Sequence, residues 1–417
     1  MEIENGIWPS RLRRTSAIPT GAIAVAAVVV WTASALYMLH FGSTWHLDLR
    51  VYRAADHKLF AGGNPFEGLF TANRLPFTYP PFALVVLSPL AFGPLGLIEA
   101  LWWSLSSLAL VMVLYLLLEA ERGRAPDVGG RIDERRLRQR SFALAASLGA
   151  VTTLALEPVR SNMDYGQVNL IVMLLVVVDL TRLNSRWRGV LVGVAAAIKL
   201  TPLVYLGYFL VRRDRASLLR GIVTFVIATV ATWLALPSES ALFWFHEVAD
   251  AKRTGDVGGV SNQSWQGLLN RAPFHGGGLA TALWVVLCVA TLACGVVLVR
   301  RRSVEEHPAE TILVLALVEL LVSPISWTHH WSWLVLAPIA AVSLWSRHRV
   351  VAWVLVALVV LAVAEPYWWI GHGPLADLAS NSLVIGGAVA LVAWTIAELR
   401  TSTTSHRPAT AAPGATG

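Results

Sequence analysis

Charged side chains are scarce in this sequence, and lysine is the scarcest of the basic residues. Charged residues make up 14% of the 417, and the three lysines are Lys58, Lys199 and Lys252. Hydrophobic residues make up 56%, and the mean hydropathy is +0.60. Ordinary soluble domains carry about 25% charged residues. The composition therefore excludes a soluble globular protein and predicts an all-α polytopic membrane protein, since only helices and closed barrels cross a bilayer.

Cysteines and nucleotide motifs are equally sparse. Cys288 and Cys294 lie six residues apart within one apolar run, without the spacing of a metal site or a redox pair. The sequence contains neither a GxGxxG nor a Walker motif. The formal net charge of +7 comes from short arginine clusters between apolar runs, which is typical of membrane topology signals rather than nucleic-acid binding. We expect no cofactor and no nucleic-acid partner, so a group donor would have to come from the membrane lipids.

Apolar runs recur along the chain and predict about twelve transmembrane helices. A further apolar piece, PPFALVVLSPLAF at 80–92, is short and bracketed by prolines, so it is compatible with a span, a re-entrant piece or an interfacial helix. The twelve predicted spans are 20–40, 97–119, 142–158, 166–182, 188–199, 202–212, 219–236, 279–300, 309–324, 331–346, 349–366 and 381–399.

The distribution of arginine sets the predicted topology. If 80–92 does not cross, 24 of the 33 Lys and Arg residues fall on one face, which the positive-inside rule places in the cytoplasm together with both termini. Two long loops, 41–96 and 237–278, then face outward. We expect one transmembrane domain over residues 1–400 and a disordered tail over 401–417, because the tail is small and polar.

The stretch WHLDLRVYRAA at 45–55 places Asp48 directly after the first span. An interfacial carboxylate balanced by Arg50 or Arg53 is the structural interpretation. The functional interpretation is a general base, since transfer onto a sugar hydroxyl needs a carboxylate within hydrogen-bond reach of that hydroxyl. Tyr52 lies beside Asp48 in the same stretch.

Two further stretches place polar groups at membrane depth. SWTHHW carries His329 and His330 between tryptophans, which indicates either an aromatic belt or a phosphate-binding or leaving-group role; a metal site is weakly supported. Lys199 precedes Pro202 in KLTP, between two predicted helices that are each too short to cross alone without tilt or thinning of the bilayer. Either its ammonium snorkels to the interface, or an anion such as a lipid phosphate meets it. Glu319 and Asp179 are predicted to be structural partners in helix packing.

Outer-face segments rich in amides and aromatics suit sugar hydroxyls, although each is also a good turn or helix cap. RSNMDYGQVN and VSNQSWQGLLNR are the two segments. With the tyrosines of the first outer loop, they give the following sugar-binding candidates: Tyr52, Tyr79, Asp164, Tyr165, Gln167, Asn262, Gln263 and Trp265.

Six motifs, in one order and spread over about two thirds of the chain, resemble the actinobacterial GT-C mannosyltransferases, in particular the PimE type. The motifs are LDLRVYRAA, LPFTYPPFALVVLSPLAF, EPVRSNMDYGQVN, GVAAAIKLTP, SNQSWQGLLNR and LLVSPISWTHHW. The resemblance implies a GT-C fold, a polyprenyl-phosphate mannose donor, a phosphatidylinositol mannoside acceptor, and an inverting transfer that forms an α-1,2 bond on the periplasmic side. It also implies that the TYPPF helix lies along the membrane.

The resemblance places the catalytic base on Asp48 and a histidine near the donor phosphate, on His329 or His330. We take His329 as the catalytic histidine, and His330, Lys199 and Arg160 as donor-phosphate ligands. We expect no metal. Enzymes that branch lipomannan, or that use decaprenyl-phosphate arabinose, remain alternatives within the superfamily. A lipid-linked sugar transporter is the alternative outside it, although the two halves of the chain share no recognisable repeat.

Overall fold

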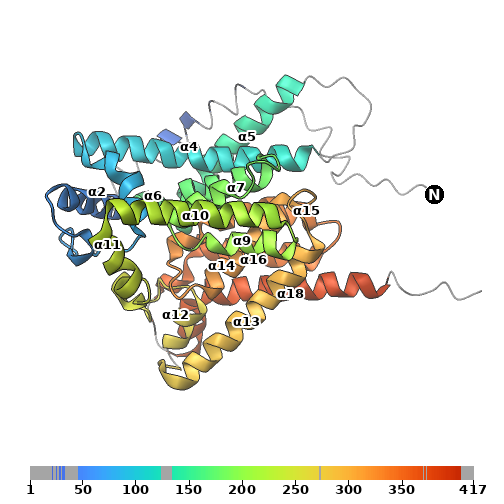
Figure 1. Ribbon diagram of the computed structural model, residues 1–417. Helices are drawn as coiled ribbons and strands as arrows, with labels where there is room; N and C mark the ends of the chain where they lie inside the picture. The colour runs from blue at the N-terminus through green and yellow to red at the C-terminus, as the bar shows by residue number, and fades with distance from the viewer. Residues whose placement is uncertain are drawn as a thin grey trace, which may run out of the picture.

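The computed structural model describes residues 46–123, 134–271, 274–369, 371 and 373–404, together with six positions between 21 and 32. The regular elements within these residues are helices, which confirms the predicted all-α class (Figure 1). The α-helices from the second onward are α2 Leu47–Phe60, α3 Pro81–Leu87, α4 Leu95–Arg122, α5 Glu134–Ala155, α6 Glu157–Tyr165, α7 Asn169–Thr181, α8 Val190–Ile198, α9 Leu203–Val211, α10 Arg215–Ala235, α11 Pro237–Leu242, α12 Trp265–Asn270, α13 Gly277–Arg301, α14 Pro308–Val322, α15 Ala337–Leu344, α16 Arg349–Ala364, α17 Pro374–Ser380 and α18 Ser382–Thr404.

Five of the described helices, α4, α10, α13, α16 and α18, are long and apolar enough to cross a membrane, and the bent pair α5–α6 would be a sixth. Apolar side chains on α10 and α13 remain largely exposed, as they would be against lipid. The chain is therefore a multi-pass membrane protein. The predicted spans at 166–182, 188–199, 202–212, 309–324 and 331–346 form shorter helices, and 20–40 lies mostly outside the described residues.

Helix α14 is the centre of the fold. Every residue from Pro308 to Leu321 is buried, and the helix packs against α13, α15, α18, α4 and α9. A helix that is apolar on all sides suits such a position, because it has no solvent-facing side to satisfy. Glu310 and Glu319 are the exceptions within its apolar sequence, and both are buried.

Helices α5 and α6 meet at a bend of 83°. Leu156 is extended and Pro158 occupies the first turn of α6, where proline is tolerated but prevents the preceding helix from continuing. The bend turns α6 against α2 and against the 3-10 helix η6, Thr328–Leu336. Gly166 ends α6 at φ +67, and a Cβ there would lie 2.8 Å from that of Leu49, so only glycine permits this close packing on α2.

A second break separates α8 from α9, as the KLTP sequence predicts. Lys199 is extended at φ −147 and ψ 130, and α9 begins after Pro202. At the other end of α8, the carboxylate of Asp179 accepts hydrogen bonds from the amides of Gly189, Leu191 and Val192, at 2.7, 2.7 and 3.0 Å. Asp179 thus satisfies the first turn of α8 from the neighbouring helix α7, which agrees with the structural role predicted for it.

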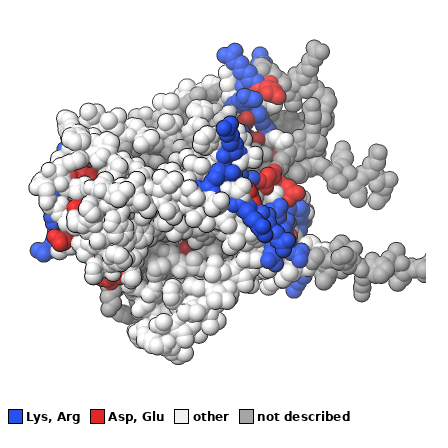
Figure 2. All heavy atoms as spheres, viewed as in Figure 1, with Lys and Arg blue, Asp and Glu red and all other residues white. Residues whose placement is uncertain are grey.

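The two predicted outer loops lie at one end of the molecule, where α2 and α11 are found in Figure 1. Residues 80–92 form α3 and a 3-10 turn, Ser88–Ala91, which pack against α2, α8 and α10. The second loop contains α11, a π-helical turn at Phe243–Glu247, and α12. Figure 2 shows that Lys and Arg side chains gather mostly at the opposite end of this view.

Candidate active site

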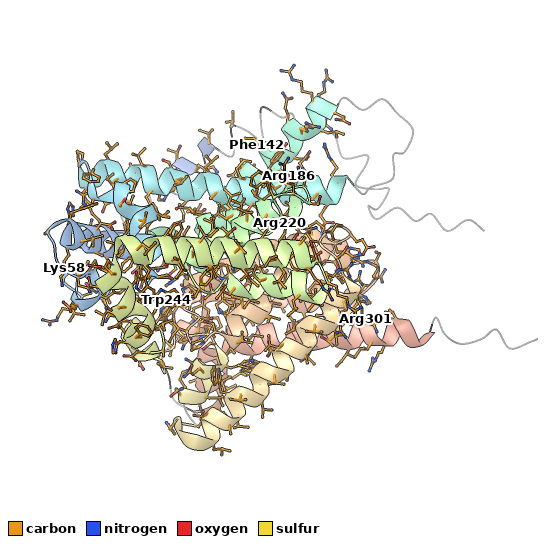
Figure 3. All side chains as sticks on the ribbon, viewed as in Figure 1. Lys58, Phe142, Arg186, Arg220, Trp244 and Arg301 are labelled. Atoms are coloured by element: carbon orange, nitrogen blue, oxygen red, sulfur yellow. The ribbon has the colours of Figure 1, made fainter. Side chains whose placement is uncertain are left out.

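A cavity of about 680 Å³ lies between the two outer loops and the central helices. Its walls come from α2, residues 75–80, α6, the α8–α9 break, the outer end of α14, residues 322–330 and the segment 243–254. Side chains from nearly every element fill the space between the ribbons in Figure 3, where Lys58 and Trp244 mark the end that carries the outer loops. Eight of the predicted site residues line this cavity: Asp48, Tyr52, Tyr79, Tyr165, Gln167, Lys199, His329 and His330.

Asp48 stands in the first turn of α2 and is held by Gln167. The Gln167 side-chain amide donates to Asp48 Oδ2 at 2.5 Å, and its carbonyl oxygen accepts from the Tyr79 hydroxyl at 2.6 Å. The Tyr52 hydroxyl lies 3.0 Å from that of Tyr79. The tyrosine contacts fix which end of the Gln167 amide faces Asp48, because a tyrosine hydroxyl donates to the carbonyl end. Gln167 therefore positions the predicted base.

Burial raises the pKa of Asp48 to about 6, against the effects of the Gln167 hydrogen bond and the charge of Lys199, which both lower it. A carboxyl with this pKa is ionised at neutral pH and is still basic enough to take a proton from a hydroxyl as that hydroxyl reacts. General bases work best when their pKa lies near the working pH. The environment of Asp48 thus suits the role that the sequence predicts for it.

The helix break places Lys199 inside the cavity. Its ammonium donates to the Asn169 side-chain oxygen at 2.5 Å and lies 3.2 Å from His330 Nε2 and 5.4 Å from the centre of the Tyr79 ring. Lysine has only donors, so His330 Nε2 accepts, and the imidazole of His330 is neutral. Lys199 is therefore positioned to bind an anion, with a neutral histidine beside it.

His329 and His330 lie in the turn between the predicted spans, and their rings are 4.8 Å apart. Asn162 and Asn169 both donate to the backbone carbonyl of His329, at 3.4 and 3.3 Å, and the Tyr165 ring lies 5.4 Å from the His329 ring. Burial lowers the pKa of both histidines well below its usual range, and the charge of Lys199 lowers it further. Both are thus neutral, and Lys199 supplies the positive charge.

The side chain of Glu157 holds the turn that carries the histidines. This buried carboxylate accepts from Thr328 at 2.9 Å and from Tyr367 at 2.8 Å. The nine-residue 3-10 helix η6 starts at Thr328, and such helices rarely exceed four residues. Fixed hydrogen bonds at its start hold His329 and His330 in position.

Five predicted site residues do not line the cavity. Arg160 forms an ion pair with Glu365, and Asp164 contributes its backbone carbonyl to His46 at the start of α2. Asn262 bonds to the backbone of Val257, Pro324 and Ser326, Gln263 bonds to the backbone around 380–384, and Trp265 donates to Thr291. These contacts join segments of the chain to one another, and a role of these residues in binding substrate stays a prediction.

Other cavity residues were not predicted as site residues. Glu319 lines the cavity from α14, although its sequence context suggested a packing role only. A carboxylate within an apolar run at membrane depth is as unusual as Lys199, and that signal would have identified it. Glu247, Asp250, Arg253 and Thr254 also line the cavity, and Arg253 pairs with Glu247 at 2.5 Å while it donates to the Phe66 carbonyl. Arg253 thus connects the two outer loops.

Within the parts of the chain that the structure describes, no three His, Cys, Asp or Glu side chains converge as metal ligands would. Asp48 lies on α2 and His329 lies on η6, so the two side chains reach the cavity from different elements. Metal independence stays a prediction, which chelation of the purified protein would test.

Comparison with known proteins identifies the family. The model of glycosyltransferase family 87 matches residues 77–324, which include Tyr79, Gln167, Lys199 and Glu319 of the cavity. The chain belongs to glycosyltransferase family 87. This family 87 enzyme is therefore a glycosyltransferase, as the residues and the resemblance predicted.

Named relatives of this family 87 enzyme come from mycobacteria. A polyprenol-phosphate-mannose-dependent alpha-(1-2)-phosphatidylinositol mannoside mannosyltransferase of Mycolicibacterium smegmatis is 33% identical over 338 residues, covering 78% of this chain and 75% of the relative. A protein of the same name from Mycobacterium tuberculosis is 33% identical over 76% of this chain and 75% of its own length. A phosphatidylinositol pentamannoside mannosyltransferase of M. smegmatis is 30% identical over 83% of both.

Proposed function

We propose that this family 87 glycosyltransferase transfers mannose from polyprenyl-phosphate mannose to a phosphatidylinositol mannoside and forms an α-1,2 bond. The observation that carries the proposal is the convergence of Asp48, Lys199 and the two histidines in one cavity. A base and an anion-binding cation are what a transfer from a sugar phosphate to a hydroxyl requires. The names of the mycobacterial relatives supply the donor and acceptor classes.

In the proposed reaction, the Asp48 carboxylate removes the proton of the acceptor hydroxyl as that oxygen attacks the anomeric carbon of mannose. The bond between this carbon and the phosphate oxygen breaks on the opposite side, so the configuration inverts. The phosphate leaves with the bonding electron pair, and Lys199 stabilises its charge. His329 and His330, as neutral imidazoles, bind the phosphate oxygens or the sugar. No covalent enzyme intermediate is needed.

We also propose the topology in which the reaction takes place. The arginine-rich end faces the cytoplasm and the cavity faces the periplasm, which the separation of charge in Figure 2 supports. The short helices α7, α8, α9, α14 and α15 pair or tilt to complete about twelve crossings, with both termini inside. Residues 1–400 form one catalytic domain, and α3 lies along the membrane in the first outer loop. The lipid chains of both substrates enter from the bilayer.

A transfer assay tests the function. Purified protein is given synthetic polyprenyl-phosphate mannose and a phosphatidylinositol tetramannoside, and wild type is compared with Asp48→Asn. We expect product from the wild type and a loss of about 10²- to 10⁴-fold in the variant, because a positioned base contributes that much. The variant should melt no lower than wild type at pH 7, since ionising Asp48 above its raised pKa costs folding free energy that asparagine does not incur.

Asp256→Asn is the matched control, because Asp256 is exposed in the second outer loop and does not line the cavity. It should keep wild-type activity. Turnover with a mannan oligosaccharide or an arabinose donor, but none with this pair, would overturn the substrates. Flux of the lipid across liposomes that survives Asp48→Ala, without any transfer, would overturn the reaction itself and favour a transporter.

A further inference from the structure

Glu319 brings a negative charge into a cavity that we propose binds a phosphate. The residue lies on α14 within an otherwise apolar stretch and is 7% exposed. Its Oε2 makes no hydrogen bond within the described part of the chain, although the carboxyl group lines the cavity. An unpaired carboxylate oxygen at membrane depth is costly, and residues of this kind persist mainly where function needs them.

Lys199 and Glu319 line the same cavity. Two other carboxyl groups of the lining have partners of their own, since Asp48 is bonded to Gln167 and Glu247 is paired with Arg253. Among the described residues that line the cavity, the other guanidinium or ammonium group is Arg253, which is already paired with Glu247. Before the donor binds, Lys199 therefore shares the cavity with the carboxylate of Glu319, whose Oε2 has no hydrogen-bond partner among the described residues. A phosphate that binds to Lys199 must compete with this carboxylate.

The charge of the lipid phosphate changes during the proposed transfer. The donor is a phosphodiester with one negative charge. When its bond to the anomeric carbon breaks, the acceptor proton goes to Asp48 and the bonding pair stays with the phosphate, which becomes a monoester. A phosphate monoester has its second pKa near 6 and so carries about −1.5 to −2 at pH 7. A site built from Lys199 alone would thus bind the product more tightly than the donor.

We propose that Glu319 weakens the binding of the polyprenyl phosphate product and so promotes its release. A fixed negative charge repels a ligand in proportion to the charge of the ligand, so Glu319 acts more strongly on the dianionic product than on the monoanionic donor. Glu319 is a positioning residue in this role, because it acts through the charge balance of Lys199. The inference rests on the proposed function for the identity of the two lipids.

The experiment compares the binding of two lipids to the full-length protein in detergent. Dissociation constants for a short-chain polyprenyl monophosphate and for polyprenyl-phosphate mannose are measured by calorimetry at pH 7.5 in wild type and Glu319→Gln. We expect the variant to bind the monophosphate about tenfold or more tightly, and the mannosylated donor more tightly by a clearly smaller factor, as the Coulomb energies of the two charges require. Added polyprenyl monophosphate should also inhibit the transfer reaction more strongly in Glu319→Gln than in wild type.

Two control variants separate charge from structure. Glu319→Asp keeps the charge and should restore a ratio of the two constants close to wild type. Glu310→Gln removes another buried glutamate of α14 that does not line the cavity, so it should leave the ratio unchanged even if it lowers stability. Weaker binding of both lipids to Glu319→Gln would mean that Glu319 holds Lys199 in place. An unchanged ratio of the two dissociation constants would mean that the charge of Glu319 does not act on the phosphate. Either result overturns the inference.

The binding measurement and the transfer assay fail independently. If wild type binds both lipids and forms no mannosylated product, the proposed function is wrong, and the ratio still decides the role of Glu319. If wild type transfers mannose but Glu319→Gln leaves the ratio unchanged, the function stands and the inference falls. Wild type that binds neither lipid overturns the inference directly.

Discussion

At the scale of single residues, the cavity is a set of side chains that hold one another in a defined state. Gln167 connects Asp48 to Tyr79, and Lys199 connects Asn169 to His330. In each case a side-chain amide of fixed orientation forms a hydrogen bond with a titratable group, Gln167 with Asp48 and Asn169 with Lys199. The protonation state of the proposed base should therefore respond to changes in a neighbour that does not itself react.

We predict that the activity of the wild type falls below pH about 6, tenfold per pH unit, because the proposed base Asp48 becomes protonated. The Gln167 hydrogen bond lowers the pKa of Asp48, so Gln167→Leu should raise this pKa and move the acid limb of kcat/KM to higher pH. Initial rates at subsaturating donor between pH 5 and 9 measure the midpoint. Gln266→Leu, a glutamine outside the cavity, is the control.

An acid limb that stayed in place or moved to lower pH in Gln167→Leu would contradict the assignment of Asp48 as the titrating base. The Gln266→Leu profile should superimpose on the wild type, since this residue has no contact with the carboxylate.

Several polar groups that stand out in the sequence lie in the cavity, and their roles stay predictions. Lys199 stands out as a charge at membrane depth, and Asp48 and the histidines stand out as polar groups next to predicted spans; all of them line the cavity. The side chains of Asn262 and Gln263 do not line it. Asparagine and glutamine serve backbone caps as readily as sugars, and the sequence pattern is the same for both. Glu319 was assigned to packing although it carried the same signal as Lys199.

At the scale of elements, the site depends on where helices stop. The α5–α6 bend brings Tyr165 to the histidine turn, and the α8–α9 break brings Lys199 into the cavity. In the sequence, Pro158 lies at the α5–α6 bend and Pro202 lies at the α8–α9 break. The direction of each bend was not predictable, because it depends on packing between distant segments, such as Gly166 against Leu49 and the amides of α8 against Asp179.

The cap of α8 gives a stability prediction. Asp179→Ala removes the acceptor of three backbone amides at the start of α8, the helix that precedes Lys199, so it should lower the free energy of unfolding by about 2 kcal/mol. Asp214→Ala is the matched control: Asp214 caps α10 through its bond to the amide of Ser217 and is less buried, so its loss should cost about 1 kcal/mol or less.

Thermal unfolding in detergent measures both variants, and hydrogen exchange of the α8 amides locates the effect. Faster exchange in α8 together with a lower melting temperature is the expected result for Asp179→Ala. Equal losses in the two variants would show that the buried carboxylate does no more than an ordinary helix cap. Gly189 must be left intact in any such series, because a Cβ there would lie 2.1 Å from the Ser217 carbonyl oxygen.

At the scale of the whole molecule, apolar surface and charge separate along one direction. The long helices expose apolar side chains along their length, while arginine gathers at one end and the cavity opens near the other. Composition alone predicted the helical membrane class, because the apolar runs are long. The number of crossings does not follow from five long helices, since each of the short central helices is too short to cross alone without tilt or thinning of the bilayer.

The proposed orientation predicts which residues meet the periplasm, and labelling of single cysteines tests it. Cys288 and Cys294 are free thiols and are first replaced by alanine. Lys58→Cys, on α2 at the end that carries the outer loops, should react in intact cells with a membrane-impermeant maleimide. Arg186→Cys is exposed in the α7–α8 connection, on the predicted arginine-rich face. It should react only after the membrane is permeabilised, because the positive-inside rule keeps that face in the cytoplasm.

Both variants should keep the transfer activity, since neither residue lines the cavity. The reverse pattern of labelling would place the cavity in the cytoplasm, where a lipid-linked donor would have no advantage over a nucleotide sugar, and the proposed topology would then be wrong.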